Sequence, residues 1–536
     1  MPTRKESNVR TPTTISFSGS ITFGCLLLAA LLSGCGGNSG TTPPSISISV
    51  APGSAFVAPG GPQQFTANVT GTTSTAVTWQ VNGVAGGSAA NGTITSNGLY
   101  TAPNTAGSVT VTAVLQSDST KSGSSKVTVL APHPVGVRQN SSGFAEFYQI
   151  ATGTTFTPRG NNYVRLAWQQ PPFQGWGQEY YHSTFNVGVY DSARAEIALT
   201  TMQANGYNIV RVFHNGCCVG TIGNPNGSGL SSAYIANVVD FLSRAANHGV
   251  YVILTTDAWL PAQGGYWNAP LPSCADFVDP NNPTSPSTNM INLCAAGVAT
   301  AAQFFHDIAQ ALVSQGARLD AIFAYELRNE YYYDSNLPPL SWTSGTVTTA
   351  DGQTYDMSSP ASQQQMMDNG LVYFTNQARA AIVAADPTAL VDVGFFWPQT
   401  PNPTRIGDPR VIELYPMMAN STADFVKLSS PDSSSELTLP QLVQNFGFVG
   451  YQQQKPVLMG EFDANESDFP LISDAVTRLQ NWQIDSCPYS VKGWLLWTWD
   501  TDESEQQHTP PDWYATAGDG SINTALAPVT RPDPCQ

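Results

Sequence analysis

From about residue 160 onward, eight short apolar segments follow one another, and most of them are separated by an amphipathic segment. The apolar segments read NNYVRLAW, NIVRVF, VYVILTT, LDAIFAYEL, ALVDVGFFW, DFVKL, KPVLMGEF and GWLLWTW. Continuous apolar strands that alternate with helices are typical of a parallel sheet covered by helices. Eight such units in a stretch of this length predict a (β/α)8 TIM barrel, an α/β fold.

The segments between the first apolar runs have the features of helices. The clearest reads DSARAEIALTTMQANG, with Asp191 as its expected N-cap and Gly206 as its stop. Further helices are expected over residues 232–247, 298–314 and 363–385. Each of these four helices precedes one of the apolar runs, as the barrel requires.

Residues 45–131 follow a different pattern. Short segments rich in Thr, Val and Ser alternate with period 2 and are separated by Gly, Asn, Ser and Pro turns. They predict a small all-β sandwich with Trp79 in its core. The segment resembles bacterial immunoglobulin-like spacer domains, and we expect a spacer because no row of aromatic residues indicates a glycan-binding module. A Pro-broken linker is expected around residues 131–140.

Residues 1–35 have the charge order of a signal peptide. Arg4, Lys5 and Arg10 precede the apolar run ITFGCLLLAALL, which is too short for a comfortable transmembrane helix. The following LSGC resembles a bacterial lipobox, so we expect Cys35 to be lipidated; the alternative is an ordinary signal peptide with a chance Cys. We therefore predict an exported lipoprotein, anchored to a bacterial outer membrane or cell surface by lipid alone, with residues 36–44 as a flexible spacer.

The composition narrows the class of partner. The chain has 536 residues and a net charge of −17, and it is 41% hydrophobic and 11% charged. This is typical of a globular, secreted protein and makes nucleic acid an unexpected partner. An acidic, charge-poor surface is compatible with a neutral polysaccharide. We expect a monomer without cofactor or metal, since no CxxC or HxxxH spacing indicates zinc.

Export also permits disulfides. Cys274 and Cys294 flank a loop rich in Pro and Asn, so we expect a local disulfide between them. A bond between Cys487 and Cys535 would hold the C-terminus in place. The adjacent cysteines at positions 217 and 218 are left over, and other pairings stay open.

In a barrel of this kind the active site lies where the strands end. Two carboxylates from different strands, with tryptophans beside them, are what hydrolysis of a glycosidic bond requires. The candidate residues at the strand ends are Arg211, His214, Asp257, Trp259, Asn329, Glu330, Glu461, Trp497 and Trp499.

Five motifs carry a resemblance to a known family, in the order RGNNY, GYNIVRVF, YELRNE, VLMGEFD and GWLLWTWD. They resemble glycoside hydrolase family 5, the cellulase and β-mannanase family of the four/seven superfamily, and place a catalytic domain over residues 132–536. The resemblance implies that Glu330 is the acid/base and Glu461 the nucleophile of a retaining, double-displacement hydrolysis of β-glucan or β-mannan. It also implies that Arg211 positions the nucleophile and that Trp497, or else Trp499, floors the reactive-sugar subsite.

The chain departs from that family in two places. The family usually has His-x-Tyr at the end of strand six, where the Tyr orients the nucleophile; here Ser429 and Pro431 stand in those positions. The usual His after strand three is also absent, with Asp257 near its place. We consider His214 as one compensating residue.

Two other functions therefore stay open. One is a non-catalytic, glycan-binding envelope lipoprotein with a degenerate barrel. The other is an exo-acting β-glycosidase of the same family, if the loop between Asp257 and Cys294 blocks one end of the cleft. The site residues also have structural interpretations, with Glu461 as an ion-pair partner of Arg211 and Glu330 as a surface carboxylate.

The segment around Glu330 holds further candidates. Glu326 lies deep in its strand, where a buried carboxylate needs a cationic partner, and Arg211 or Arg165 is expected to supply it. The tyrosines at positions 331 to 333 are candidates for a wall of a sugar site, with loop packing as the equal alternative.

Overall fold

The computed structural model of the chain describes the residues on which all structural statements below rest. They are residues 45–164, 167–168, 179–180, 184–215, 222–256, 264–266, 273–278, 280, 287–398, 414–430, 437–499 and 513–535. Residues 1–44, with the expected signal peptide, the expected spacer and Cys35, lie outside them, as do Asp257, Trp259, Pro431 and the cysteines at 217 and 218.

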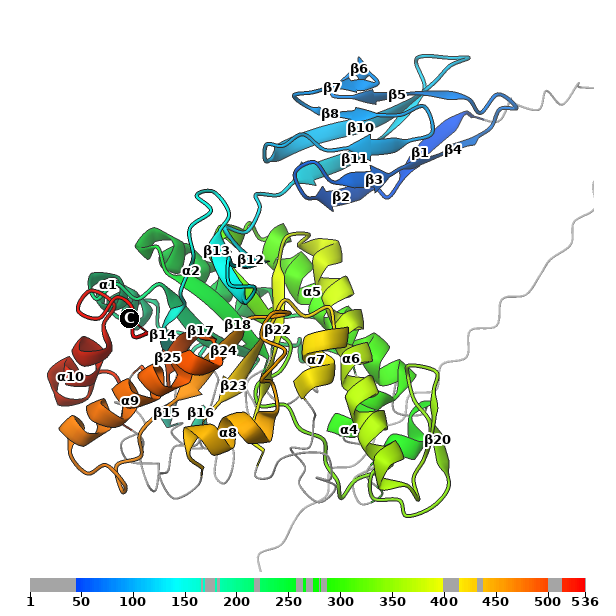
Figure 1. Cartoon of the computed structure of the whole chain (residues 1–536). Helices are drawn as coiled ribbons and strands as arrows, with labels where there is room; N and C mark the ends of the chain where they lie inside the picture. Colours follow the sequence, from blue (N-terminus) through cyan, green and yellow to red (C-terminus); the bar gives the residue numbers. More distant parts are fainter. Residues whose placement is uncertain are drawn as a thin grey trace, which may run out of the picture. The chain divides into compact units, whose positions relative to one another are not determined.

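Eight parallel strands form a closed barrel, which confirms the predicted fold (Figure 1). Around the barrel, in order, the strands are β14 (Arg159–Asn162), β17 (Ile209–Asn215), β18 (Tyr251–Thr256), β19 (Ile322–Glu326), β22 (Leu390–Phe395), β23 (Phe425–Ser429), β24 (Val457–Phe462) and β25 (Val491–Leu496). The first strand begins and ends earlier than the run NNYVRLAW predicted. The last two residues of that run form a separate strand, β15 (Ala167–Trp168), which pairs antiparallel with β16 (Glu179–Tyr180).

Helices surround the barrel (Figure 1). The described helices are α1 (Ser192–Ala204), α2 (Ser232–His248), α4 (Thr288–Leu293), α5 (Ala295–Ser314), α6 (Pro360–Ala385), α7 (Leu414–Asn420), α8 (Leu439–Phe446), α9 (Ile472–Ser486) and α10 (Ala517–Leu526). As predicted, Asp191 caps α1, where its side chain accepts hydrogen bonds from two backbone amides at 3.0 Å. A short hairpin of β20 (Thr346–Thr348) and β21 (Thr354–Asp356) precedes α6.

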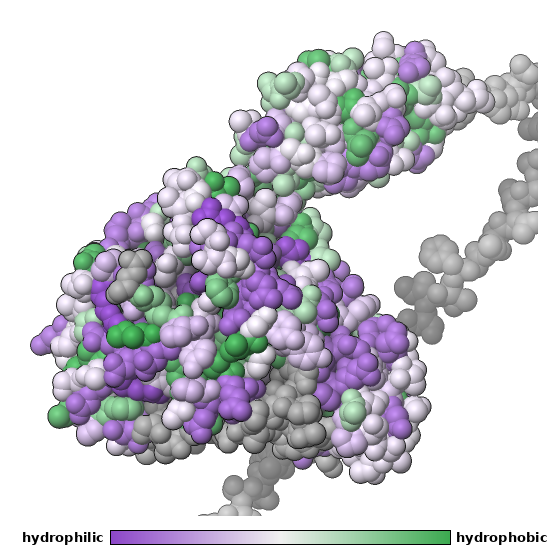
Figure 2. Space-filling view, viewed as in Figure 1, coloured by the Kyte–Doolittle hydropathy of each residue, from purple (hydrophilic) through white to green (hydrophobic). Residues whose placement is uncertain are grey.

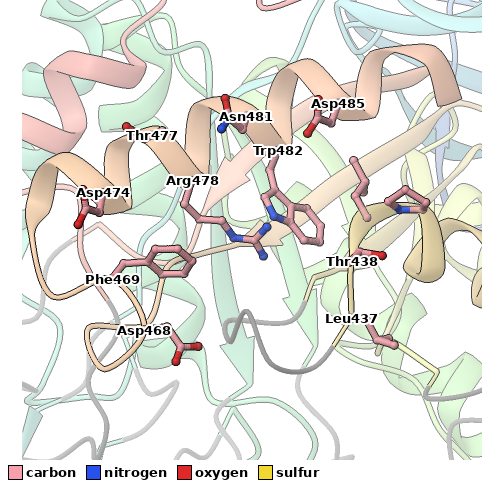
Figure 3. Close-up of a pocket in the computed structure, with 12 residues that line it drawn as sticks. Leu437, Thr438, Asp468, Phe469, Asp474, Thr477, Arg478, Asn481, Trp482 and Asp485 are labelled. Carbon is pink, nitrogen blue, oxygen red and sulfur yellow. The ribbon is translucent and has the colours of Figure 1, made fainter.

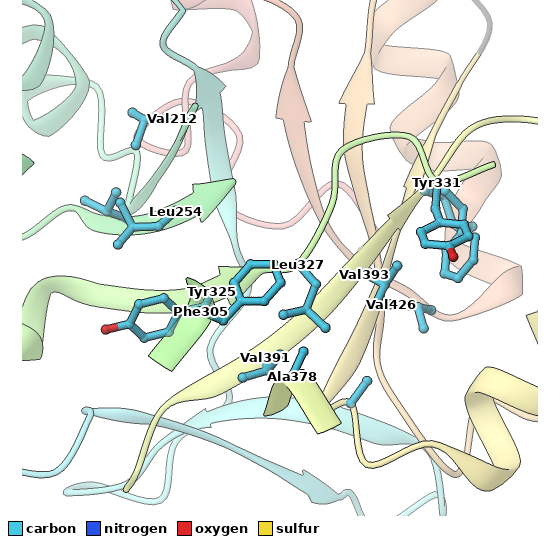
Figure 4. Packing of buried hydrophobic residues seen from close by; sticks show 14 of the residues in the cluster. Val212, Leu254, Phe305, Tyr325, Leu327, Tyr331, Ala378, Val391, Val393 and Val426 are labelled. Atoms are coloured by element: carbon cyan, nitrogen blue, oxygen red, sulfur yellow. The ribbon is translucent and has the colours of Figure 1, made fainter. Parts of the chain in front are cut away.

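The main apolar core lies between the strands and the helices. Figure 4 shows Tyr325 of β19 and Val391 of β22 in the same packed layer as Phe305 of α5 and Ala378 of α6. All of these side chains are almost fully buried. On the face shown in Figure 2, by contrast, hydrophobic residues are scattered among hydrophilic ones. No helix in the described ranges combines the length and apolar character needed to cross a membrane.

The N-terminal region is rich in β-strands, as predicted, with Trp79 buried in its own apolar core. A five-stranded sheet contains β2 (Ser54–Val57), β11 (Ser122–Val129), β10 (Gly107–Leu115), β5 (Val77–Val81) and β6 (Val84–Ala85). A four-stranded sheet contains β3 (Pro62–Gln64), β9 (Leu99–Thr101), β8 (Gly92–Ile94) and β7 (Gly87–Ser88), and a further pair consists of β1 (Ser47–Ala51) and β4 (Thr66–Thr70).

The expected linker around residues 131–140 is partly a strand, so that prediction was wrong in part. β12 (Val135–Gln139) pairs antiparallel with β13 (Ala145–Gln149), and the hairpin lies across one end of the barrel (Figure 1). Phe147 of this hairpin packs edge-on against Phe323 and Phe425, with ring centroids 5.1 Å apart in both pairs. The hairpin thus closes the N-terminal end of the barrel with apolar side chains.

The inward-facing side chains of the strands form layers. Because side chains alternate along a strand, residues two apart face the same side. The layer beside the hairpin is apolar, with Ile209, Ile253, Leu390, Phe425, Leu458 and Leu495. Two residues further along, the strands present a buried polar layer of Arg211, Thr255, Glu326, Asp392 and Lys427. The change from apolar to charged side chains therefore occurs inside the barrel, toward the C-terminal ends of the strands.

Both predicted disulfides are present. Cys274 is bonded to Cys294, and Cys487 is bonded to Cys535. The second bond joins the C-cap residue of α9 to the C-terminal segment that follows α10.

Candidate active site

Arg211 of β17 is the centre of the buried polar layer. It is 0% exposed, and its Nε and Nη2 atoms donate to the two carboxylate oxygens of Glu326 at 2.7 and 2.5 Å. Thr255 also donates to Glu326, at 3.3 Å. The buried carboxylate of Glu326 is therefore paired with Arg211, which was one of the two arginines expected for this role from the sequence. Such a bidentate pair fixes the plane of the guanidinium group.

Arg211 also donates to side chains of β14, of β24 and of the segment just after β19. Its Nη2 atom donates to Asn329 Oδ1 at 2.7 Å, and its Nη1 atom donates to Asn162 Oδ1 at 2.9 Å and to Glu461 Oε1. Asn162 is in turn held by donating to two backbone carbonyls, those of Gly460 and Leu496. Arg211 thus joins the ends of strands β14, β19 and β24 through side chains that have little freedom to move.

Glu461 lies near the end of β24 and is 8% exposed. Lys427 Nζ donates to the same Oε1 atom that Arg211 contacts, at 2.9 Å. Burial by itself would raise the pKa of Glu461, but the charges and hydrogen bonds of Lys427 and Arg211 lower it below its ordinary value. The Glu461 side chain is therefore an ionised carboxylate with a fixed orientation.

Glu330 lies just beyond β19, where the chain still runs between its neighbouring strands. Asn329 N donates to Thr256 O at 2.7 Å, and Tyr331 N donates to Gly394 O at 2.8 Å. Between them, Glu330 has a φ of 42° and is half-buried. A non-glycine residue in this left-handed region stores strain, and such strain is found mainly where a side chain has to be aimed.

Lys427 is one of two site residues that sequence reasoning missed. It lies in the middle of β23 and is 0% exposed; its Nζ atom is 3.1 Å from Ser429 Oγ and 3.4 Å from Asn329 Oδ1. Attention to the strand end directed the sequence analysis to Ser429 and Pro431 instead. The available signal was a single lysine inside the otherwise apolar run DFVKL, where a buried cation needs an acid.

Asp392 of β22 was also missed. It is 0% exposed, and burial together with the negative charge of Glu326 raises its pKa well above the ordinary value. The surroundings of Asp392 therefore disfavour its charged form. The two cations Arg211 and Lys427 face two carboxylates, Glu326 and Glu461.

His214 is buried next to this layer and does not contact Glu461 through any hydrogen bond that the structure describes. Its Nε2 atom is 3.0 Å from Thr256 Oγ1, and burial lowers its pKa to about 4. It is therefore a neutral imidazole, and the described hydrogen bonds do not give it the role of a missing strand-six residue.

The two strand-eight tryptophans belong to different surroundings. Trp497 packs against Phe213, with ring centroids 5.9 Å apart, and against Val164 at the strand ends. Trp499 is 3% exposed and lines a cavity of about 690 Å³ with residues of α1 and of segment 514–519. Trp497 is thus the better placed of the two beside the charged layer.

Two of the three tyrosines after Glu330 pack in the core, whereas Tyr332 is half-buried. Tyr331 is 1% and Tyr333 0% exposed, and Tyr333 Oη donates to Met367 O at 3.0 Å. Figure 4 shows Tyr331 within the packed apolar residues. These two residues therefore do not form a wall of a sugar site.

A second cavity of about 650 Å³ lies between α8 and α9. Figure 3 shows Arg478 pointing between Phe469 and Trp482, and its guanidinium carbon lies 3.9 Å from the centre of a Trp482 ring. This cavity shares no lining residue with the cluster around Arg211. Among the residues that the structure describes, no group of three or more His, Cys, Asp or Glu could hold a metal ion.

Comparisons with known proteins agree with the motifs. The model of the family described as Cellulase (glycosyl hydrolase family 5) matches residues 170–503, more than half of the chain. No curated protein matches the chain.

Several solved structures are similar in fold. The β-mannanase from blue mussel Mytilus edulis has a TM-score of 0.45 and 16% identity, covering 76% of this chain and 99% of its own. The β-1,4-D-mannanase from Cryptopygus antarcticus has a TM-score of 0.42 and 17% identity, covering 74% of this chain and 94% of its own. The exo-β-1,4-mannosidase from Opitutaceae bacterium strain TAV5 has a TM-score of 0.43 and 16% identity, covering 73% of this chain and 58% of its own. At these TM-scores and identities, the three structures do not bear on what this chain binds or cleaves.

Proposed function

This chain belongs to glycosyl hydrolase family 5, and we propose that it is a retaining glycosidase that cleaves the internal bonds of a β-linked glucan or mannan. Glu461 is the nucleophile and Glu330 the acid/base in this proposal. No cofactor takes part, because the two carboxylates supply all the acid, base and nucleophile chemistry that the reaction needs.

The observation that carries the proposal is the environment of Glu461. A carboxylate that attacks an anomeric carbon has to be ionised and fixed in direction. Lys427 and Arg211 meet both requirements, since they lower the pKa of Glu461 and bond to its Oε1 atom. A carboxylate that served only as the ion-pair partner of Arg211 would not need a second cation.

Glu330 supplies the second carboxyl group. Its neighbour Asn329 accepts a hydrogen bond from Arg211, which ties the end of β19 to the cluster that holds Glu461. In the first step Glu461 attacks the anomeric carbon while Glu330 protonates the departing sugar oxygen. In the second step Glu330, now ionised, activates water, which displaces Glu461 and gives a product of retained configuration. This mechanism requires carboxyl groups about 5–5.5 Å apart.

The test is release of reducing sugar from a panel of β-glucans and β-mannans. Wild type is expected to act on one of the two groups, and Glu461→Gln and Glu330→Gln are expected to lose activity. Glu196→Gln is the matched control, because Glu196 lies on the outer helix α1, where it pairs with Arg244. If no substrate is cleaved by the wild type, or if Glu461→Gln keeps full activity, the proposal is wrong.

The stereochemistry has its own measurement. Proton NMR of the first-formed product identifies its anomer before mutarotation. A retaining enzyme gives the β-anomer, whereas an α-anomer would show inversion and would contradict the role given to Glu461. The size of the early products separates internal cleavage from release of single sugars at a chain end.

We also propose that the protein is exported and lipid-anchored through Cys35. The basic residues before a short apolar run and the LSGC motif support this. The two disulfides, Cys274–Cys294 and Cys487–Cys535, are what an oxidising compartment permits. Labelling with radioactive palmitate is expected to mark the wild type and not Cys35→Ser, and equal labelling of the two would exclude this anchor.

A further inference from the structure

Lys427 occupies an unusual position for a lysine, since it is fully enclosed by the barrel and lies beside the proposed nucleophile. Its Nζ atom is 2.9 Å from Glu461 Oε1 and 3.9 Å from Glu326 Oε1. Lysine is rarely buried unless it is paired, because removing its charge from water is costly. We propose that Lys427 is a positioning residue for catalysis, which holds the Glu461 carboxylate in its attacking orientation in place of a hydroxyl donor; this inference rests on the proposed function.

The neighbouring strands are built around the lysine stem. Gly394 of β22 is the register partner of Lys427, and a Cβ atom there would lie 3.0 Å from Lys427 Cδ and 2.6 Å from Glu326 Oε1. A Cβ atom on Gly460 of β24 would overlap the Lys427 side chain. Glycines on both sides therefore make the channel through which the lysine reaches Glu461. Because two neighbouring strands both leave room for this side chain, the barrel is adapted to a lysine at position 427.

The pattern of contacts leaves one carboxylate oxygen for chemistry. Lys427 and Arg211 both donate to Oε1 of Glu461. With Oε1 held by two cations, Oε2 is the atom that forms the bond to the anomeric carbon. In the covalent intermediate Oε1 becomes the ester carbonyl oxygen and still accepts from both donors. When water attacks the anomeric carbon and gives its proton to Glu330, the bond from that carbon to Oε2 breaks. Its electron pair returns to the Glu461 carboxylate, where the two cations stabilise the charge.

Lys427 also has partners for the stage at which Glu461 has lost its charge. Its Nζ atom is within hydrogen-bond distance of Ser429 Oγ and Asn329 Oδ1. These two acceptors keep the ammonium group solvated while the ester exists. Ser429, one of the residues found in place of the usual strand-six motif, thus accepts a hydrogen bond from the lysine.

The titratable groups of the buried layer around Glu461 come from four strands of the barrel. They are Arg211 on β17, Glu326 on β19, Asp392 on β22 and Lys427 on β23, with neutral His214 beside them. Arg211 and Lys427 are the two cations of this layer, and Glu326 and Glu461 are the carboxylates bonded to them. Removing Lys427 leaves two carboxylates with one cation, so Glu461 takes up a proton more readily.

The experiment compares pH profiles of kcat/KM for Lys427→Met and wild type. The acid limb reports ionisation of the free enzyme's nucleophile. It is expected to move up by about one pH unit or more, the scale of an opposite charge within about 4–6 Å. Lys427→Arg, which keeps the charge, is expected to restore the limb in part. A folded Lys427→Met with the acid limb of the wild type would overturn the proposal.

Lys455→Met is the matched control. Lys455 is also buried, but its Nζ atom donates only to the backbone carbonyls of Ser421 and Ala423 in the described hydrogen bonds. Its replacement is expected to lower the melting temperature and to leave the acid limb in place. A shift equal to that of Lys427→Met would show a general effect of losing a buried lysine and would also overturn the proposal.

Two further measurements separate possible failures. If Lys427→Met does not fold, Lys427→Gln takes its place, since it removes the charge and keeps a hydrogen-bond donor; the same upward shift is expected. If the wild type cleaves no glycan, the proposed function fails. The effect of Lys427 on Glu461 is then measured directly, by carbon-13 NMR titration of the Glu461 carboxyl group in wild type and in Lys427→Met. An unchanged titration in Lys427→Met would overturn the inference by itself.

Discussion

The two ends of the barrel are made by the same strands and differ completely in chemistry. At the N-terminal end, Phe147 of the hairpin covers a layer of apolar side chains. Toward the C-terminal end, the next layer consists of charged and polar side chains around Arg211, equally buried. Burial of apolar surface stabilises a fold, whereas burial of charges costs free energy unless every charge is paired. The apolar end therefore offsets the cost of the charged end.

Strand β23 shows this division within five residues. Phe425, Lys427 and Ser429 all face inward, as the alternation of side chains requires. Phe425 packs on the hairpin, Lys427 pairs with Glu461, and Ser429 accepts a hydrogen bond from Lys427. Phe425, which packs in the apolar layer, is thus only two residues away from Lys427, which contacts the proposed nucleophile. Mutations at the two ends are expected to separate stability from activity.

The largest effect is expected at Arg211. Replacing it with Met leaves Glu326 and Glu461 buried with only Lys427 to balance them. We expect a loss of about 3–5 kcal/mol in the free energy of unfolding, and a fall in kcat/KM of about 10²–10³-fold. Denaturant unfolding and steady-state kinetics measure the two. Arg318→Met is the control, because Arg318 pairs with Asp320 on the surface, and it is expected to stay within about 0.5 kcal/mol of the wild type.

At the opposite end, Phe147→Ala is expected to cost stability alone. It removes a fully buried ring that packs against Phe323 and Phe425, at a cost of about 3–5 kcal/mol. The kcat of the folded enzyme is expected to stay within about twofold, because the charged layer keeps all its partners. Phe144→Ala on the same hairpin is the control, since Phe144 is 37% exposed. A large fall in kcat for Phe147→Ala would show that the two ends are coupled.

These two ends were not equally visible in the sequence. The strands were found because their apolar runs are continuous. Glu461 was found because it lies where its run ends, and Arg211 because the motif GYNIVRVF carries the family resemblance. Lys427 and Asp392 lie inside runs, where a period-2 pattern gives the side that a residue faces but not its partner. The hairpin was read as a linker because Pro132 and Pro134, just before it, mark breaks, and the packing of Phe147 against distant strands leaves no local signal.

Removal of the Cys487–Cys535 disulfide is expected to weaken the fold without changing the chemistry. The bond closes a loop with a sequence separation of 48, and loss of such a loop constraint is worth about 4 kcal/mol in the chain-entropy model. The actual loss is expected to be smaller, because Arg159 also holds the tail by donating to the carbonyls of Leu526 and Arg531. Thermal unfolding of Cys535→Ser, with kcat as the second readout, checks both statements.

The smallest effect concerns a titrating group beside the apolar end. His133 is buried; its Nε2 atom is 2.9 Å from Asp386, and its Nδ1 atom is 2.9 Å from the carbonyl of Ile322 at the start of β19. Burial by itself would lower the pKa of His133, but the charge of Asp386 raises it above its ordinary value. A raised histidine pKa adds stability that is complete below about pH 6.5 and is lost as the pH rises through the folded-state pKa. Unfolding free energies measured from pH 5 to 9 are therefore expected to fall, by at most about 1.4 kcal/mol per pH unit for one proton. His133→Gln is expected to remove this part of the pH dependence and to leave the acid limb of kcat/KM unchanged, because His133 and Glu461 belong to opposite ends of the barrel.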